Sequence, residues 1–470
     1  MKKSIDHIIL VSIDTLRADC IGASPRAGDF SKKYNVNLKL ETSPLDKILQ
    51  SGLYFNNCIS AAPYTSASHA SYFTGCWPLN HNIYEFFNRK LSRKTIFEYA
   101  KQSGYNTIFQ TDFPVILGSY LGLTKGINHY FIEDEVTAWN TLNENKDKKT
   151  LSFFHFGGVH YPYGFHTLKF GGNDYIRKVK QLEEKYHINF KQENQLEDVL
   201  DETFRNRLDR ELLLRYKLIV EKLYGKKLYN DLFYLYLEGI NYFMKHRFNK
   251  FITNVKKFVD NNNALLCIFS DHGEEWNKES YGHHNSLLDP VLRVPLLFYG
   301  KDVKKGVINH LVRTIDVAPT IHSFMQSSFK KTSMNGVPLH IFRKSGKETS
   351  NKYAIAQIWP AMVDKRQLFN YQEQAIKKNK LSKPLKTFLS LEMICNKKHK
   401  LVISYAENTR MLTRKFVCHH QKSDIFIERE HNKLMSILKK YNKYKKIDKN
   451  KLKSIELNIK EELNSLGYNV

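Results

Sequence analysis

Residues 7–14 read HIILVSID, an apolar run that ends in an acidic residue. An unbroken run of this kind is typical of a strand that is buried on both faces of a sheet. The design recurs in residues 264–275, ALLCIFSDHGEE, and in residues 151–163, LSFFHFGGVHYPY, while residues 294–300, VPLLFYG, give a further strand candidate. The first three runs therefore predict buried strands with polar residues at or beyond their carboxyl ends.

Helical patterns separate these runs along the chain. Residues 95–104, TIFEYAKQSG, precede one strand candidate, and residues 242–262 precede the run that ends in Asp271 and His272. Alternating strands and helices predict an α/β fold, in which helices flank a largely parallel, mixed sheet. Ligands bind at the carboxyl ends of the strands in such sheets, and the acidic residues and histidines fall there.

The chain divides into a large and a small part. We expect a catalytic domain over residues 1–345, with a charged, glycine-poor helical insertion at about 169–236 that covers the sheet. Short strand candidates and a lysine-rich helical stretch follow, which predict a smaller C-terminal α+β subdomain over residues 346–470. The chain has 470 residues, and a division of this kind is usual for that length.

Composition excludes several classes of protein. The six cysteines are scattered without a CxxC pair, which argues against a disulfide framework or structural zinc. Neither a secretory leader nor a membrane span is apparent, so we expect a cytoplasmic protein. The net charge of +26 favours anionic substrates, but the lysines are spread along the whole chain and no specific nucleic-acid motif accompanies them.

Four residues have side chains suited to one divalent cation: Asp14, Thr65, Asp271 and His272. Two carboxylates, an imidazole and a hydroxyl are ligands that Ca²⁺, Mg²⁺, Mn²⁺ or Zn²⁺ accepts. A cation would also solve the problem that a threonine hydroxyl is a poor nucleophile at neutral pH, because coordination lowers the pKa of a bound hydroxyl.

The chain resembles the sulfatase branch of the alkaline phosphatase superfamily. Five stretches carry the resemblance and occur in the order typical of the family: VSIDTLRADCIG (11–22), APYTSASHASYFTGCWPLNHN (62–82), GGVHYPY (157–163), FSDHGEEW (269–276) and GHHNSLLDPVLRVPLLFYG (282–300). The resemblance implies an alkaline-phosphatase-like sandwich fold and an ester hydrolase or transferase.

Roles for individual residues follow from this resemblance. Asp14, Asp271 and His272 would hold one metal ion, and Thr65 would be the metal-bound nucleophile. The remaining candidates would bind the substrate's oxygens or protonate the leaving group: His69, His160 and His283, with His284 as the alternative to His283, and Arg17, for which a salt bridge within the turn at 14–19 is the alternative. If a second ion binds, His160 and His283 are its first candidate ligands.

Formylglycine is not expected. True sulfatases make it from the cysteine of a Cys-x-Pro-x-Arg motif, and this chain has TSASH at residues 65–69 instead. Cys76 precedes Pro78 by two residues, but Asn80 replaces the arginine and the segment follows the Thr-Gly turn. We therefore interpret Cys76 as a packed thiol and Thr65 as the attacking residue.

A threonine nucleophile favours phosphorus over sulfur. A formylglycine hydrate releases sulfate by collapsing to its aldehyde, whereas a threonine ester needs a second attack on the central atom. We therefore predict a phosphate-like ester as substrate: a phosphomonoester, phosphodiester or phosphonate of a small molecule, glycan or lipid head group. Two alternatives remain, a sulfatase that works without formylglycine and a non-catalytic binder of sulfated or phosphorylated glycans.

Overall fold

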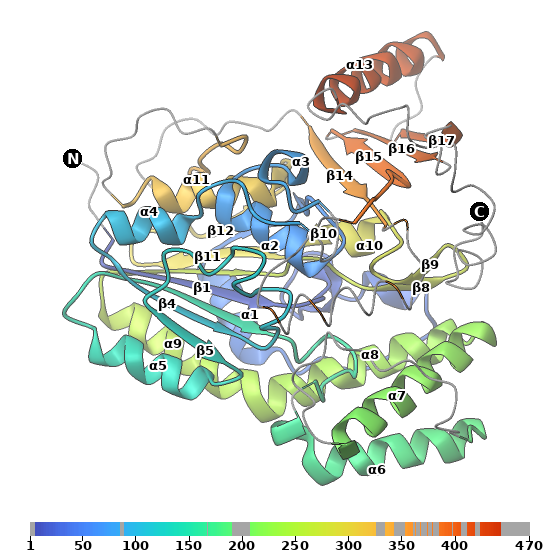
Figure 1. The fold of residues 1–470 in the computed structure, drawn as a ribbon, viewed down its shortest axis with the longest axis horizontal. Helices are drawn as coiled ribbons and strands as arrows, with labels where there is room; N and C mark the ends of the chain where they lie inside the picture. Colours follow the sequence, from blue (N-terminus) through green and yellow to red (C-terminus); the bar gives the residue numbers. More distant parts are fainter. Residues whose placement is uncertain are drawn as a thin grey trace.

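An eight-stranded sheet forms the centre of the protein, in the order β12-β2-β11-β7-β1-β6-β4-β5 (Figure 1). From β7 to β5 all neighbouring strands run parallel, and β11 is antiparallel to both β7 and β2. This confirms the predicted mixed, largely parallel sheet. The strands span His7–Ile13 (β1), Leu53–Phe55 (β2), Asn106–Thr111 (β4), His129–Ile132 (β5), Thr150–Phe156 (β6), Ala264–Phe269 (β7), Leu296–Gly300 (β11) and Gly306–Ile308 (β12).

The computed structural model describes most of the chain. The described residues are 5–84, 89–166, 168–189, 207–325, 334–342, 353–360, 385–396, 398–405, 411–418 and 424–442, with Met362, Gln367, Gln374 and Lys378. Within this part of the chain, no helix has both the length and the apolar character needed to cross a lipid bilayer.

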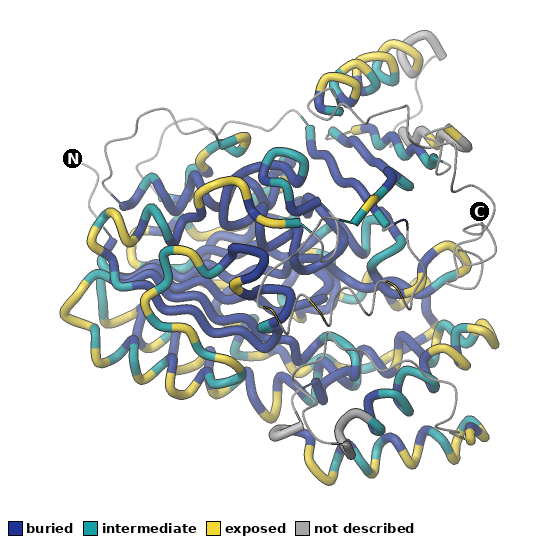
Figure 2. Tube along the Cα trace, viewed as in Figure 1, coloured by how far each residue is buried: buried dark blue, intermediate teal, exposed yellow. Residues whose placement is uncertain are grey.

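Helices cover both faces of the sheet, because successive side chains of a strand point to opposite sides. Ile9, Val11 and Ile13 of β1 pack with one set of helices, and Ile8 and Leu10 pack with the other. Figure 2 shows the strands buried between these layers. The first set is α1 (Ser43–Ser51), α5 (Glu135–Glu144), α8 (Tyr229–Phe243) and α9 (Asn249–Asn261), and the second is α2 (Thr65–Thr74), α4 (Ile96–Gln102) and α11 (Val317–His322).

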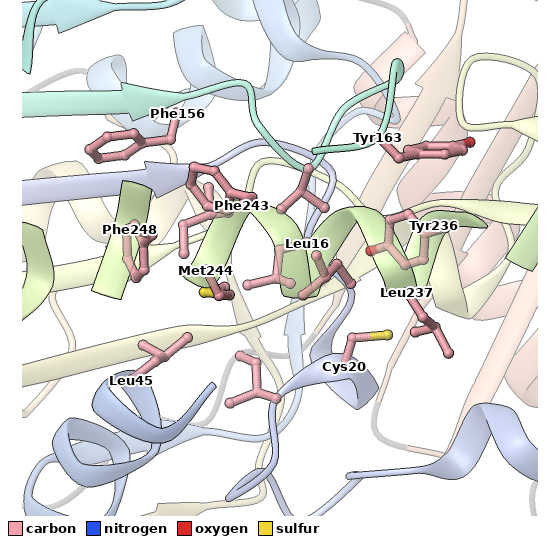
Figure 3. Close-up of a cluster of buried hydrophobic side chains, with 14 of the residues drawn as sticks. Leu16, Cys20, Leu45, Phe156, Tyr163, Tyr236, Leu237, Phe243, Met244 and Phe248 are labelled. Atoms are coloured by element: carbon pink, nitrogen blue, oxygen red, sulfur yellow. The ribbon is translucent and has the colours of Figure 1, made fainter. Parts of the chain in front are cut away.

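The expected insertion is helical where it is described. It forms α6 (Leu168–Tyr186), α7 (Arg207–Gly225) and most of α8, and residues 190–206 lie outside the described part. A π-helical turn, Met244–Phe248, joins α8 directly to α9. Figure 3 shows the end of α8 packed against Phe156 of β6 and against Leu16, which follows β1.

A four-stranded antiparallel sheet forms the smaller C-terminal part, as predicted. Its strands are β14 (Ala354–Ile358), β15 (Leu391–Cys395), β16 (His399–Tyr405) and β17 (Met411–Cys418), and α13 (Asp424–Asn442) packs on it. Lys400 Nζ anchors the sheet to the large part, at 2.7 Å from Asp289 Oδ1. The expected boundary near residue 345 and the basic stretch after residue 442 lie outside the described residues.

Short elements complete the large part. They are η1 (Ala18–Cys20), η2 (Asp29–Lys32), β3 (Cys58–Ile59), α3 (Pro78–His81), β8 (Glu275–Asn277), β9 (Ser280–Gly282), α10 (Asp289–Leu292), β10 (Arg293–Val294), β13 (Val312–Arg313) and η5 (Thr314–Asp316).

A buried ion cluster fastens the π-helical turn to the sheet. Arg247 donates two hydrogen bonds to Asp112, at 2.6 and 2.9 Å, and two to Glu135, at 3.0 and 2.8 Å. Burial disfavours the charged form of Asp112, but Arg247 outweighs it and lowers the pKa of the carboxyl to about 2. Asp112 directly follows β4, so this pair joins the helical layer to the carboxyl end of the sheet.

We predict that Asp112→Asn lowers the free energy of unfolding by about 3–5 kcal/mol, because it leaves part of the buried Arg247 charge uncompensated. Guanidinium denaturation measures this loss. Asp29→Asn is the control: its ion pair with Arg26 is 3.5 Å long and largely exposed, so we expect a loss of about 1 kcal/mol or less. Equal losses in the two variants would contradict the predicted role of the cluster.

Candidate active site

Three potential metal ligands meet at the carboxyl ends of β1 and β7. Asp14 directly follows β1, whereas Asp271 and His272 follow β7, which pairs with β1 in parallel. One ligand atom from each residue lies within 4.8 Å of the others, and all three side chains are buried. The parallel register therefore brings together two segments that are about 250 residues apart in the sequence.

The atoms that face one another in this cluster are hydrogen-bond acceptors. Asp14 Oδ1 and Asp271 Oδ2 are buried without a hydrogen-bond partner. His272 Nδ1 lies 3.1 Å from the carbonyl of Gly273 and must donate to it, so Nε2 carries the lone pair. This Nε2 lies 3.3 Å from Asp271 Oδ2 and 3.8 Å from Asp14 Oδ1.

Such an arrangement is unfavourable without a cation, because buried acceptors that face one another have no donor to share. Burial raises the pKa of Asp14 to about 6. A divalent cation would satisfy all three atoms at once, and two carboxylates with one imidazole are a ligand set that such ions accept. The residues present therefore fit a metal ion.

Thr65 lies against this cluster. Its Oγ1 is 3.2 Å from Asp14 Oδ2 and 3.4 Å from His272 Nε2. Thr65 is the first residue of α2, and Tyr64 before it has extended backbone angles, so the chain turns into the helix at this point. The hydroxyl consequently lies at the positive end of the helix dipole and beside the candidate metal ligands.

Cys76 lies far from these groups. It follows the carboxyl end of α2, whose ten residues span about 15 Å from Thr65. The thiol is buried, its Sγ is 3.5 Å from the carbonyl of Thr74, and burial raises its pKa. These contacts agree with the expected packed thiol.

His69 lies in the core and bonds to the backbone of Thr65. Its Nδ1 is 2.9 Å from the carbonyl of Thr65, and its Nε2 is 2.9 Å from Ser12 Oγ. The ring is fully buried among aromatic side chains, and burial lowers its pKa to about 3. Both nitrogens are engaged within the protein, and the expected role as a substrate ligand or proton donor stays a prediction.

Arg17 is likewise buried and engaged. Its Nε and Nη2 bind Asp19 at 2.9 and 2.7 Å, and its Nη1 donates to the carbonyl of Glu274 at 3.0 Å. The guanidinium also lies 4.8 Å from the ring centroid of Phe233 on α8. The structure therefore contains the salt bridge within the turn after β1, and Arg17 also ties this turn to the segment after His272, while the expected substrate contact stays a prediction.

Three histidines extend the cluster outward from His272. The ring of His283 stacks on that of His272 with centroids 4.3 Å apart, and the rings of His284 and His160 lie 4.0 and 5.3 Å from His283. His160 and His284 are half-buried. These three expected substrate residues therefore form one group beside the candidate metal ligands.

Glu274 holds the ring of His283 by a hydrogen bond. Its Oε1 is 2.9 Å from His283 Nδ1, and burial together with the charges of Asp14 and Asp271 raises the pKa of Glu274 well above its usual value. Burial and the neighbouring histidines lower the pKa of His283. The contact with Glu274 occupies Nδ1, so Nε2, which has no partner among the described residues, is the nitrogen left for a substrate oxygen.

Sequence reasoning missed several residues of the site. His155 Nε2 lies 3.1 Å from Asp14 Oδ2. The residue lies within the apolar run of β6, and the sequence of that run does not show toward which face of the sheet its side chain points. Glu274 lies two residues after His272, and that position was the available signal. Tyr236 lies on α8 in the insertion, and the composition of the insertion does not indicate which of its residues contact the site.

A family profile described as sulfatase matches residues 6–327, more than half of the chain. The chain belongs to the sulfatase family. It is 24% identical over 303 residues to the low-salt glycan biosynthesis sulfotransferase Agl7 of Haloferax volcanii, covering 60% of this chain and 57% of that protein. It is also 21% identical over 384 residues to an arylsulfatase of Clostridium perfringens, covering 71% of this chain and 77% of that one. The chain thus spans little more than half the length of the first relative.

Solved structures share the sulfatase-family fold with this chain. A protein in complex with its substrate D-glucosamine-2-N,6-O-disulfate superimposes with a TM-score of 0.60 and 15% identity, covering 94% of this chain and 98% of that one. The phosphonate monoester hydrolase from Silicibacter pomeroyi gives a TM-score of 0.58 and 13% identity, covering 94% and 96%. At these identities the likeness is one of fold.

We predict that a divalent cation stabilises the metal-stripped protein by about 2.7 kcal/mol at one hundred times its Kd, and that Asp271→Asn abolishes this gain. Thermal unfolding with and without Ca²⁺, Mg²⁺, Mn²⁺ or Zn²⁺ measures it, and elemental analysis identifies the bound ion. Without metal, Asp271→Asn should be at least as stable as wild type, since it removes a buried unpaired charge.

Asp260→Asn is the control for this measurement, because Asp260 is an exposed carboxylate on α9. It should keep the full metal-dependent gain. A wild-type protein that none of the four ions stabilises would contradict the assignment of the cluster as a metal site.

Proposed function

We propose that this sulfatase-family protein is a metal-dependent enzyme that cleaves or transfers a phosphate-like ester, with Thr65 as its nucleophile. The position of Thr65 Oγ1 carries the proposal: it lies 3.2 Å from Asp14 Oδ2 and 3.4 Å from His272 Nε2. A nucleophilic hydroxyl needs a neighbour that favours its deprotonated form, and the candidate metal ligands are those neighbours.

Asp14, Asp271 and His272 would hold the metal ion, with Thr65 as a further ligand. When bound, the ion would supply positive charge that lowers the pKa of the Thr65 hydroxyl and stabilises charge on the ester oxygens. The amino end of α2 adds a partial positive charge at the same point. His155, Ser12 and His69 keep Asp14 and Thr65 in place.

The reaction would proceed by two displacements at phosphorus. Thr65 Oγ1 attacks phosphorus opposite the ester oxygen, and the bond to that oxygen breaks as the oxygen gains a proton. His283 would supply this proton from Nε2, which has no partner among the described residues, while Nδ1 takes up a proton from Glu274, so that the ring stays neutral. Water or an acceptor hydroxyl then attacks the same phosphorus, its proton returns through His283 to Glu274, and Thr65 leaves as the alkoxide with which the cycle began.

The second displacement is the reason for preferring phosphorus. A threonine ester cannot collapse to an aldehyde, so release requires renewed attack on the central atom. Phosphorus accepts such in-line displacement readily. The similarity of the fold to phosphonate monoester hydrolases is compatible with this substrate class.

Sulfuryl chemistry is the second candidate function. Two relatives favour it: one is named a sulfotransferase of glycan biosynthesis and the other an arylsulfatase. A sulfated glycan would then be the donor or substrate, and Thr65 would pass the group on to an acceptor without formylglycine. The same residues would serve both candidates, so the substrate panel below decides between them.

We predict that Thr65→Ala lowers kcat/KM by at least about a thousandfold while the bound metal and the fold stay intact, because it removes the attacking oxygen. Thr65→Ser should keep measurable turnover. Thr74→Ala is the matched control on the last turn of the same helix, where the hydroxyl bonds only within α2 and to the next turn, and it should behave like wild type. Full activity of Thr65→Ala would remove Thr65 from the mechanism.

A panel of p-nitrophenyl esters tests the substrate class. We expect phosphate, phosphodiester or phosphonate esters to turn over, with a phosphoryl adduct on the peptide that contains Thr65 when brief reactions are analysed by mass spectrometry. Aryl sulfate should yield at most one sulfated Thr65 per chain. Catalytic turnover of the sulfate alone would favour the second candidate, and an adduct on another residue would contradict the role of Thr65.

A further inference from the structure

Thr15, between Asp14 and the turn that follows β1, has a strained backbone. Its φ angle is +58°, in the left-handed region that L-residues other than glycine rarely adopt. The strain is greatest for a β-branched residue such as threonine. Contacts from the surrounding structure must therefore hold Thr15 in this conformation.

The conformation of Thr15 orients a metal ligand. The Thr15 N–H donates to Asp271 Oδ1 at 3.2 Å. With Oδ1 engaged in this way, Oδ2 is the carboxylate oxygen that remains for the candidate metal site, where it lies 3.3 Å from His272 Nε2. A relaxed backbone at Thr15 would direct the N–H elsewhere and release Asp271 from this orientation.

Tyr236 holds the other side of the same peptide segment. Its hydroxyl donates to the carbonyl of Thr15 at 2.8 Å and accepts from the N–H of Arg17 at 3.0 Å. The side chain is fully buried, so water is not available to replace these bonds. Figure 3 shows Tyr236 on α8 among the residues that follow β1, including Leu16 and Cys20.

We propose that Tyr236 is a metal-positioning residue: its hydroxyl clamps the strained Thr15 peptide, and this fixes both Asp14 and the oxygen of Asp271 that would face the ion. The inference rests on the proposed metal-dependent function. Residues that orient ligands commonly change metal affinity by about 10- to 100-fold when they are removed. The helical insertion would thereby influence how tightly the candidate ligands after β1 and β7 bind the ion.

The alternative is a purely structural role, in which Tyr236 only anchors the insertion to the segment after β1. Tyr175 performs that role elsewhere in the insertion: its buried hydroxyl donates to the carbonyl of Leu212 at 3.2 Å and joins α6 to α7. Both tyrosines are buried and both donate to a backbone carbonyl, but only Tyr236 is bonded to the segment beside Asp14. Tyr175→Phe is therefore a matched control for Tyr236→Phe.

The test is a titration of the metal-stripped, full-length protein with Mn²⁺, in which the free ion is measured by electron paramagnetic resonance and no substrate is present. We expect Tyr236→Phe to weaken Mn²⁺ binding about 10- to 100-fold. Tyr175→Phe should bind Mn²⁺ like wild type, although it too loses a buried hydrogen bond to a backbone carbonyl. Thr15→Gly/Tyr236→Phe should bind more tightly than Tyr236→Phe, because glycine adopts the left-handed conformation without strain.

Each of the following results would overturn the inference. Wild-type affinity in Tyr236→Phe, or equal losses in both tyrosine variants, would overturn the inference and leave the proposed function standing. A Tyr236→Phe protein that fails to fold by circular dichroism, while Tyr175→Phe folds, would also overturn it, since the hydroxyl would then serve the fold. If wild type binds another of the four ions in place of Mn²⁺, the same titration is made with that ion, and a wild type that binds none of the four would overturn the metal-dependent function itself and this inference with it.

Discussion

Three buried acceptor atoms that face one another are the constraint on which the rest of this structure depends. One ligand atom from each of Asp14, Asp271 and His272 lies within 4.8 Å of the others, and Asp14 Oδ1 and Asp271 Oδ2 have no hydrogen-bond partner among the described residues. A buried unpaired charge costs several kcal/mol, so a fold that gathers two must offset that cost elsewhere. The parallel pairing of β1 with β7 fixes the two segments at one edge, and the buried hydrophobic layers on both faces of the sheet keep that edge rigid.

Neutral groups bond to one oxygen of each carboxylate and leave its other oxygen facing the centre of the cluster. His155 engages the Oδ2 atom of Asp14, and the Thr15 peptide engages the Oδ1 atom of Asp271. In each carboxylate the second oxygen is left without a donor. The supporting groups thus select which oxygen faces the centre, and that selection is what would distinguish a metal site from a buried ion pair.

The fold and the ligand cluster could be predicted because they depend on periodicity and on strand ends. Unbroken apolar runs mark β1, β6 and β7, and parallel strands bring their carboxyl ends to one edge, so Asp14 and Asp271 were expected to meet. The directions of His69 and Arg17 could not be predicted, because a sequence does not show which way a side chain points. His69 turns into the aromatic core, and Arg17 folds back onto Asp19. Tyr236 could not be predicted because it lies within a helix of the insertion, where no strand end marks a position beside the site.

The insertion is joined to the catalytic edge at two buried points, and this constrains how it can vary. Tyr236 of α8 bonds to the segment after β1, and Arg247, just beyond α8, binds Asp112 at the end of β4. Both fixed points lie on or next to α8, whereas α6 and α7 pack mainly on each other and on α8. Changes to α6 or α7 could therefore reshape the approach to the site without disturbing the ligands beneath. A change at Tyr236 of α8 would reach the ligands themselves, because the Thr15 peptide between Asp14 and Asp271 would lose its partner.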